Sequence, residues 1–125
     1  MNFMKKSLVL SFFTLLSLTL YAASSERNIT SRWCSVMNGI GEHRTSYGTY
    51  VDCLTKQYAV EAEFDYNWKE SIGQSLHYAE ATGRKAAILF IHRKESNKNY
   101  LLELQNVIEA YNLPIKVFEI DQQVN

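Results

Sequence analysis

The sequence has few of the features that divide a chain into parts. It contains one proline, Pro114, and it has no repeat or low-complexity tract, so nothing marks a linker between two domains. It also lacks a surplus of positive charge, because 13 basic residues are balanced by 13 acidic ones. The basic composition typical of nucleic-acid-binding domains is therefore absent. These absences predict one small domain and do not by themselves point to nucleic acid.

The first 23 residues have the plan of a secretory signal peptide. Lys5 and Lys6 form a basic start, an apolar stretch runs from Leu8 to Leu20, and small residues follow at positions 22–24. Serine and threonine interrupt the stretch, which is shorter than the ~20 apolar residues of a membrane span, so an uncleaved anchor is the alternative. We therefore predict an exported protein, periplasmic or secreted, whose mature domain covers residues 24–125.

Two cysteines, Cys34 and Cys53, belong to that domain. In an exported chain an even pair is most simply a disulfide, and two buried free thiols are the alternative. A catalytic thiol is not indicated, because a cysteine inside a strand without a base partner lacks the electropositive setting that forms a thiolate.

Hydrophobic periodicity predicts elements in the order αβββαβαβ. Helical spacing covers residues 28–39, 67–82 and 100–111. Two hairpins are expected between the first two helices, with a three-residue loop at 46–48 and a two-residue tip at 56–57. The expected core-facing residues are Ile29, Trp33 and Val36 in the first helix, Trp68, Ile72, Leu76 and Ala79 in the second, and Leu101, Leu104, Ile108 and Tyr111 in the third.

The strand pattern gives the fold class. The unbroken apolar run 86–91 is typical of a strand buried on both faces of a parallel sheet, and residues 115–120 form a last strand after Pro114. Three antiparallel strands followed by helix-linked parallel strands predict an α/β fold, in which a mixed sheet is flanked by helices.

Several carboxylates stand inside the predicted hairpins, where strands disfavour them. The two loop lengths place Glu42 opposite Asp52 and Asp52 opposite Glu61, and Glu63 shares their face because side chains alternate with period two. Carboxylates about 5 Å apart across strands need a cation or a shared proton. The row predicts a site for a hard divalent cation such as Mg²⁺. The alternative is a solvated sheet face with scattered acids.

A longer set of motifs surrounds these acids in a fixed order. It reads Gly-Glu42-x-Arg44, Gly48-Thr-x-Val-Asp52-Cys-Leu-Thr55, Tyr-Ala-Val-Glu61-x-Glu63-Phe64, Trp68 and Ile72-Gly-Gln-Ser-Leu-x-Tyr-Ala79. This ordered set resembles the PD-(D/E)XK nuclease superfamily, in particular its small bacterial and phage-borne members. The resemblance covers about half of the mature chain.

The resemblance implies a restriction-endonuclease-like core and a nuclease that hydrolyses phosphodiester bonds with Mg²⁺ or Mn²⁺. Asp52 and Glu61 match the two metal-binding acids of the superfamily, and Glu42 matches the additional acid that precedes them. Gln74 and Tyr78 match a Gln-x-x-x-Tyr motif and share a helix face because they are four residues apart. Many nucleases also pair into homodimers, so a homodimer is a further expectation.

The chain departs from the motif at Glu63, which stands where the superfamily has a lysine; Lys69 is the nearest basic substitute. We therefore consider two functions. In the first, a nuclease, Glu42, Asp52 and Glu61 hold the metal, and the catalytic residues are Asp52, Glu61, Glu63, Gln74 and Tyr78. In the second, the same fold is an inactive, disulfide-clamped binding module. A carboxylate-pair glycosidase is a third, weaker option, since no sugar cleft can be read.

Two short basic runs, Arg84-Lys85 and Arg93-Lys94, flank the central strand. They can meet a phosphate backbone, but short charge runs are usually solvated loop ends, and we interpret them so.

Overall fold

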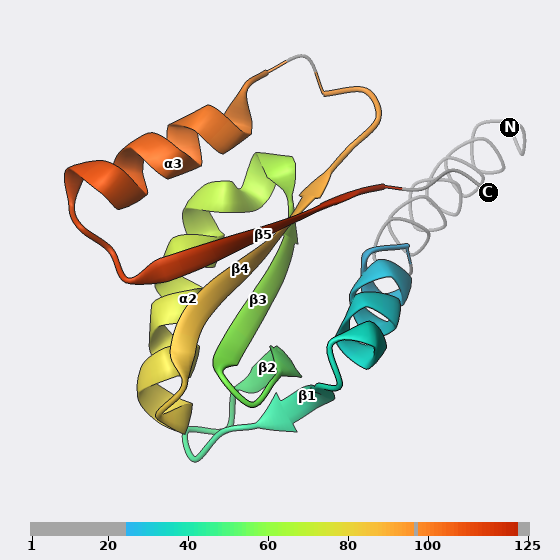
Figure 1. The fold of residues 1–125 in the computed structure, drawn as a ribbon, viewed down its shortest axis with the longest axis vertical. Helices are drawn as coiled ribbons and strands as arrows, with labels where there is room; N and C mark the ends of the chain where they lie inside the picture. The colour runs from blue at the N-terminus through green and yellow to red at the C-terminus, as the bar shows by residue number, and fades with distance from the viewer. Residues whose placement is uncertain (1–24, 97, 123–125) are drawn as a thin grey trace, which may run out of the picture.

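The computed structural model describes residues 25–96 and 98–122, so the expected signal peptide, residues 1–23, lies outside them. The elements follow one another as helical residues 25–36, β1 (Ile40–Arg44), β2 (Tyr50–Leu54), β3 (Tyr58–Phe64), the 3₁₀ turn η1 (Asp65–Asn67), α2 (Trp68–Thr82), β4 (Lys85–His92), α3 (Tyr100–Ala110) and β5 (Ile115–Asp121) (Figure 1). The predicted α/β order is confirmed. Within the described ranges, no helix has the length and apolarity to cross a bilayer.

The five strands form one mixed sheet in the order β1-β2-β3-β4-β5. The first three pair antiparallel, whereas β4 pairs parallel with both β3 and β5. Gly41 pairs with Cys53 in the first hairpin, and Leu54 pairs with Ala59 in the second. Both registers are those predicted from the loop lengths. The mixed sheet and its register are therefore confirmed.

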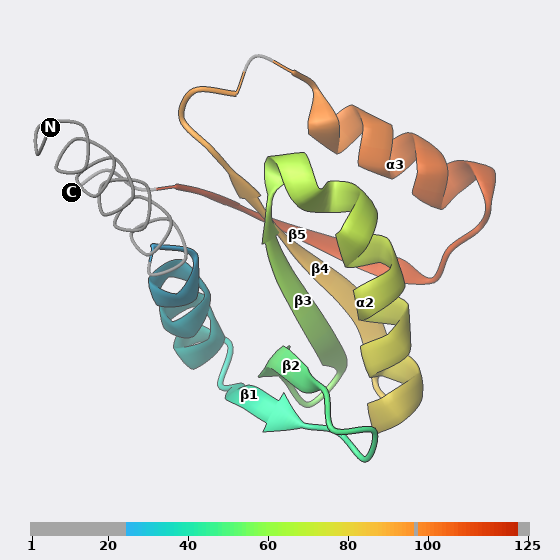
Figure 2. The same ribbon diagram turned by 180° about the vertical axis from the view of Figure 1, so that it is seen from behind.

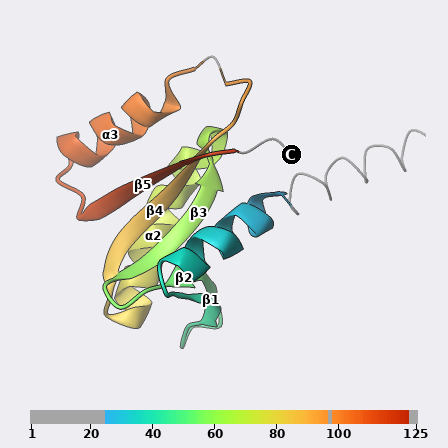
Figure 3. The same cartoon turned by 45° about the vertical axis from the view of Figure 1, so that its right-hand side comes forward.

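Helices cover both faces of this sheet. α2 and α3 pack on one face around Ile88, Phe90 and Leu104. The helical residues 25–36 lie against the other face, across β2 and β3 (Figure 3), whereas Figure 2 shows α2 in front of the sheet. Residues 86–91 of β4 are buried throughout, as expected for a central strand enclosed by both layers.

Most of the predicted helix faces pack on the sheet, with two exceptions. Val36 and Tyr111 were expected in the core, but their side chains are 80% and 75% exposed. Each stands where its helix gives way to a turn, so the helical period that placed it on the apolar face no longer applies. These two assignments are wrong.

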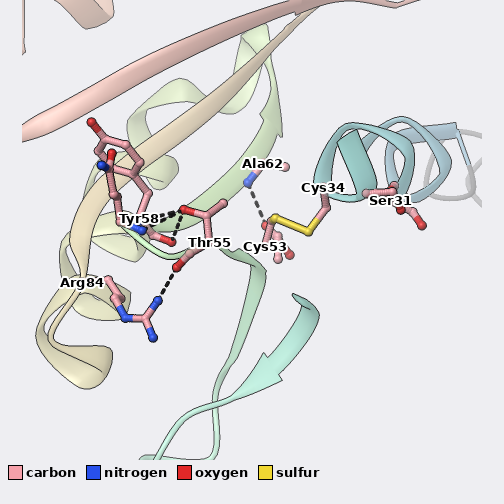
Figure 4. The surroundings of a disulfide bond; sticks show 10 residues. Ser31, Cys34, Cys53, Thr55, Tyr58, Ala62 and Arg84 are labelled. Carbon is pink, nitrogen blue, oxygen red and sulfur yellow. Dashed lines mark hydrogen bonds between the residues drawn. A yellow bond between two sulfur atoms is a disulfide. The ribbon is translucent and has the colours of Figure 1, made fainter. Parts of the chain in front are cut away.

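The Cys34–Cys53 disulfide is present, and it joins the helical residues 25–36 to β2 (Figure 4). The two Cα atoms are 5.6 Å apart, and both cysteines are buried. Gly39 passes close to the bond, and a Cβ atom at this position would overlap with both sulfur atoms. The bond therefore fixes the helix against the strand that carries Asp52.

Candidate functional site

The site begins where β2 separates from β3. Cys53 is paired with Val60, and two positions further along β3 the Asp52 side chain replaces the neighbouring strand. Its Oδ2 atom accepts a hydrogen bond of 2.8 Å from the Ala62 amide, which is labelled in Figure 4. The Asp52 carboxylate thus takes over an amide group of β3 that β2 no longer reaches.

Glu61 is the most deeply buried acid at this place, with 3% of its surface exposed. Its carboxyl group adjoins that of Asp52, whose charge opposes its ionisation. Its Oε2 atom is buried and has no hydrogen-bond partner among the described residues. Buried polar atoms are nearly always satisfied in folded proteins. An unsatisfied carboxylate oxygen therefore marks a position where a proton or a cation is needed.

We call Glu26, Asp52, Glu61 and Glu63 the acid cluster. Burial and the Asp52 charge raise the pKa of Glu61 to about 10. Burial and the charges of Glu63 and Asp52 raise the pKa of Glu26 to about 7. Burial also raises the pKa values of Asp52 and Glu63. The cluster therefore retains protons at neutral pH, and a bound cation would relieve the same repulsion.

Gln74 and Tyr78 reach the cluster from α2. The Tyr78 hydroxyl donates to Gln74 Oε1 at 3.3 Å. Burial together with the nearby Glu61 charge raises the pKa of Tyr78. The structure thus brings the two motif residues to Glu61. Glu63 has a partner of its own, because Asn67 Nδ2 donates to its Oε2 atom at 3.2 Å.

Glu42 lies beside the cluster and outside its buried part. Its side chain is 66% exposed, and its Oε1 atom is 3.8 Å from Arg27 Nε. The Glu42 backbone has a positive φ of 51°, which interrupts regular strand geometry next to its expected partner, Asp52. The Lys69 Nζ atom lies 5.7 Å from the centre of the Trp68 ring. Lys69 is thus placed over an aromatic side chain.

Glu26 is the acid that our sequence reasoning missed. It lies on the helical residues 25–36, eight positions before Cys34, with Thr30 midway between them. Positions four apart share one face of a helix. A signal therefore existed, since a disulfide from Cys34 to Cys53 directs that face toward the neighbour of Cys53, Asp52. The disulfide thus places Glu26 close to the acids of the sheet.

A cavity of ≈ 530 Å³ adjoins the cluster between the helical residues 25–36 and the first hairpin. Its lining includes three acidic side chains, from Glu26, Glu42 and Asp52. The cavity gives a ligand access to the cluster from the side of the disulfide, because Cys34 also lines it.

The donor atoms fit a hard divalent cation with few protein ligands. Within residues 25–96 and 98–122, no group of three or more His, Cys, Asp or Glu side chains is arranged to hold a metal ion. Asp52 and Glu61 nevertheless supply adjacent carboxylates, and Glu61 Oε2 is unsatisfied. Mg²⁺ is typically bound by one or two carboxylates together with waters. The residues therefore fit a two-carboxylate site and not an all-protein cage.

Comparison with known proteins adds one similarity. No family model matches the sequence, and no solved structure matches it. It is similar to a viral protein. The chain is 27% identical over 115 residues, 91% of its length, to the "Putative KilA-N domain-containing protein L32" of Acanthamoeba polyphaga mimivirus. It spans 30% of that relative, so the activity of the whole relative is not transferred to it.

Proposed function

We propose that this protein is a metal-dependent nuclease that hydrolyses phosphodiester bonds at the acid cluster. The observation that carries the proposal is the buried Glu61, whose carboxyl group adjoins that of Asp52 and has an unsatisfied oxygen atom. The resemblance of the surrounding motifs to PD-(D/E)XK nucleases supports it, and so does the order of helices and strands.

Each residue has a role in this proposal. Asp52 and Glu61 hold Mg²⁺ or Mn²⁺, a cation that polarises the phosphate and lowers the pKa of a water molecule. Asp52 is positioned for this role by the Ala62 amide, which fixes its Oδ2 atom. Tyr78 orients Glu61 and is itself held by Gln74.

The remaining acids are placed around this pair. Glu26 lines the cavity, so it faces an incoming ligand. Glu63 adds negative charge near Asp52 and is held by Asn67. Glu42 contributes from the rim of the cavity through its charge on Asp52.

We further propose that the protein acts outside the reducing cytosol. The disulfide supports this location, because such bonds persist mainly in oxidising compartments. The signal peptide that we predict in residues 1–23 agrees with it.

A second candidate is an inactive binding module with the same fold. Glu63 favours this alternative, because it replaces the motif lysine and increases the repulsion of a phosphate. Lys69, the nearest substitute in the sequence, lies over the Trp68 ring.

Cleavage of supercoiled plasmid separates the two candidates. Oxidised protein is incubated with Mn²⁺ beside Asp52→Asn, Glu61→Gln and the exposed control Glu109→Gln on α3. The nuclease proposal predicts nicking by the wild type and the control, and at least a ~100-fold loss in both cluster variants. Folded wild-type protein that does not nick, or nicking that survives both cluster substitutions, would contradict it.

A further inference from the structure

Beyond the acid cluster, the end of β3 and the start of the loop after β4 carry a layered group of side chains. The Phe64 and Tyr66 rings are stacked, with centroids 6.1 Å apart and planes inclined by 13°. The Arg93 guanidinium carbon lies 4.4 Å from the centre of the Tyr66 ring. We call Phe64, Tyr66 and Arg93 the arginine–aromatic stack.

A buried carboxylate holds this stack in place. Asp65 is 2% exposed, and its Oδ1 atom accepts a hydrogen bond of 2.6 Å from Arg93 Nε. The same oxygen atom accepts the Tyr66 amide at 2.9 Å. Asp65 thus fixes both the arginine and the tyrosine backbone, which reduces the entropy lost when either binds a ligand.

The stack is partly exposed and has N–H donors that no described residue uses. The Arg93 side chain is 37% exposed, and Tyr66 is 45% exposed. Among the described residues, the hydrogen bond of the Arg93 side chain uses Nε, and none involves its terminal amino groups. An arginine has five N–H donors in a planar fork, so those groups are available to an anion.

The stack adjoins the acid cluster through one residue. Phe64 directly follows Glu63 of the acid cluster in the chain, and its ring begins the stack. Tyr66 and Arg93 follow β3 and β4, which are parallel, so they stand at the carboxyl ends of these strands. In open α/β sheets, ligands bind in the crevice outside those ends.

We propose that the arginine–aromatic stack binds one nucleotide of single-stranded nucleic acid beside the phosphodiester bond at the acid cluster. Aromatic rings and guanidinium planes bind unpaired bases by stacking, and the arginine fork binds phosphate. A duplex hides its base faces within its own stack, so the partner is single-stranded. The inference rests on the proposed function, and it identifies Arg93 as a positive charge near a cluster whose motif lysine is replaced by Glu63.

The test is binding of fluorescein-labelled oligonucleotides, measured by anisotropy with the oxidised full chain in Ca²⁺, which occupies oxygen sites. The probes are oligo(dT), oligo(rU) and a DNA duplex of equal length. We expect the single strands to bind at least about tenfold more tightly than the duplex, since stacking requires free base faces. Whether oligo(dT) or oligo(rU) binds better identifies the sugar of the partner, and either preference supports the inference.

Substitutions locate the contact. Tyr66→Ala is expected to weaken single-strand binding by about tenfold, whereas Tyr66→Phe keeps it within about twofold. Arg93→Lys keeps the charge and loses the planar fork, so affinity falls while the salt dependence of binding remains. Tyr111→Ala is the matched control, because Tyr111 is 75% exposed at the far end of α3.

Three outcomes would overturn the inference: no binding by the wild type, equal binding of duplex and single strand, or unchanged affinity in Tyr66→Ala. Plasmid nicking in Mn²⁺ is measured on the same samples. If the protein nicks plasmid while Tyr66→Ala binds single strands with unchanged affinity, the proposed role of the stack is contradicted and the nuclease proposal stands. Binding that depends on Tyr66 without nicking of any substrate overturns the nuclease and supports the stack as part of a binding module.

Discussion

Glu61 and Asp65 lie four residues apart, one in β3 and the other just after it, and they are 3% and 2% exposed. Their surroundings shift the pKa values of the two carboxyl groups in opposite directions. Burial opposes ionisation of Asp65, but the hydrogen bond and the charge of Arg93 prevail and lower its pKa. Burial and neighbouring acids raise the pKa of Glu61 to about 10. Burial alone therefore does not mark a candidate functional acid, whereas burial among like charges, with an unsatisfied oxygen, does.

The difference follows from the strands beside each acid. Arg93 leaves β4 directly alongside the end of β3, so Asp65 meets a cation. Glu61 stands where β2 has separated, and the side chain that enters the gap is another acid, Asp52. A candidate catalytic carboxylate in β3 is thus followed, in the turn after the strand, by a structural one.

The largest expected effect comes from removing the disulfide. Cys34→Ser combined with Cys53→Ser should lower the free energy of unfolding by about 3 kcal/mol, because the bond closes a loop across 19 positions. The helix that carries Glu26 should also loosen, so the pKa of Glu61 should fall while that of Asp65 stays. Urea unfolding and carboxyl NMR titration measure the two effects. An unchanged Glu61 titration in a folded variant would show that the helix does not shape the cluster.

Removing the charge of Asp65 should be the next most damaging change. Asp65→Asn loses a charge-assisted hydrogen bond to Arg93, and we expect a loss of about 2 kcal/mol at pH 7. The folded-state pKa of Asp65 is lowered, so its contribution is present above the ordinary value of 3.8 and is lost as pH falls through the folded-state value. The deficit relative to wild type should therefore shrink in acid. A constant deficit from pH 7 to pH 2.5 would contradict the ion pair.

Replacing Glu61 should change the free energy of unfolding in the opposite direction. Its folded-state pKa is raised from 4.5 to about 10, so the contribution of Glu61 to wild-type stability is fully present below pH 4.5 and is lost as pH rises toward 10. Glu61→Gln, which cannot ionise, should be about 1–2 kcal/mol more stable than wild type at pH 8 and equal to it at pH 4.5. Thermal unfolding at the two pH values checks this. Destabilisation at pH 8 would show that the Glu61 charge is compensated.

The smallest effect is expected at Glu42. Its ion pair with Arg27 is exposed, and such pairs contribute about 0–1 kcal/mol. Glu42→Gln should therefore change the free energy of unfolding by less than about 0.5 kcal/mol. If Glu42→Gln changes the free energy of unfolding as much as Glu61→Gln does, Glu42 belongs to the buried cluster and its assignment to the exposed rim is wrong.

Local patterns were sufficient to predict the sheet. The loop lengths 46–48 and 56–57 set the hairpin registers, and the apolar run of β4 marked the central strand. The same registers aligned Asp52 with Glu61. The exposure of Glu42 could not be predicted from these registers. Side-chain alternation assumes regular strand geometry, and the positive φ of Glu42 departs from it. Glu26 was missed because a contact between a helix and a sheet depends on packing, which here is set by one disulfide.

The measurement that tests the central claim most directly is a calorimetric titration of Mn²⁺ at pH 8 and pH 5. The samples are the wild type, Glu61→Gln and Asp65→Asn, and each substitution replaces one buried carboxyl group, the first in β3 and the second in the turn that follows it. We predict that the wild type and Asp65→Asn bind Mn²⁺ alike, more tightly at pH 8 because the cation competes with protons, while Glu61→Gln binds at least about tenfold more weakly. Undetectable binding by the wild type, or equal affinity in Glu61→Gln, would contradict a metal site at the acid cluster.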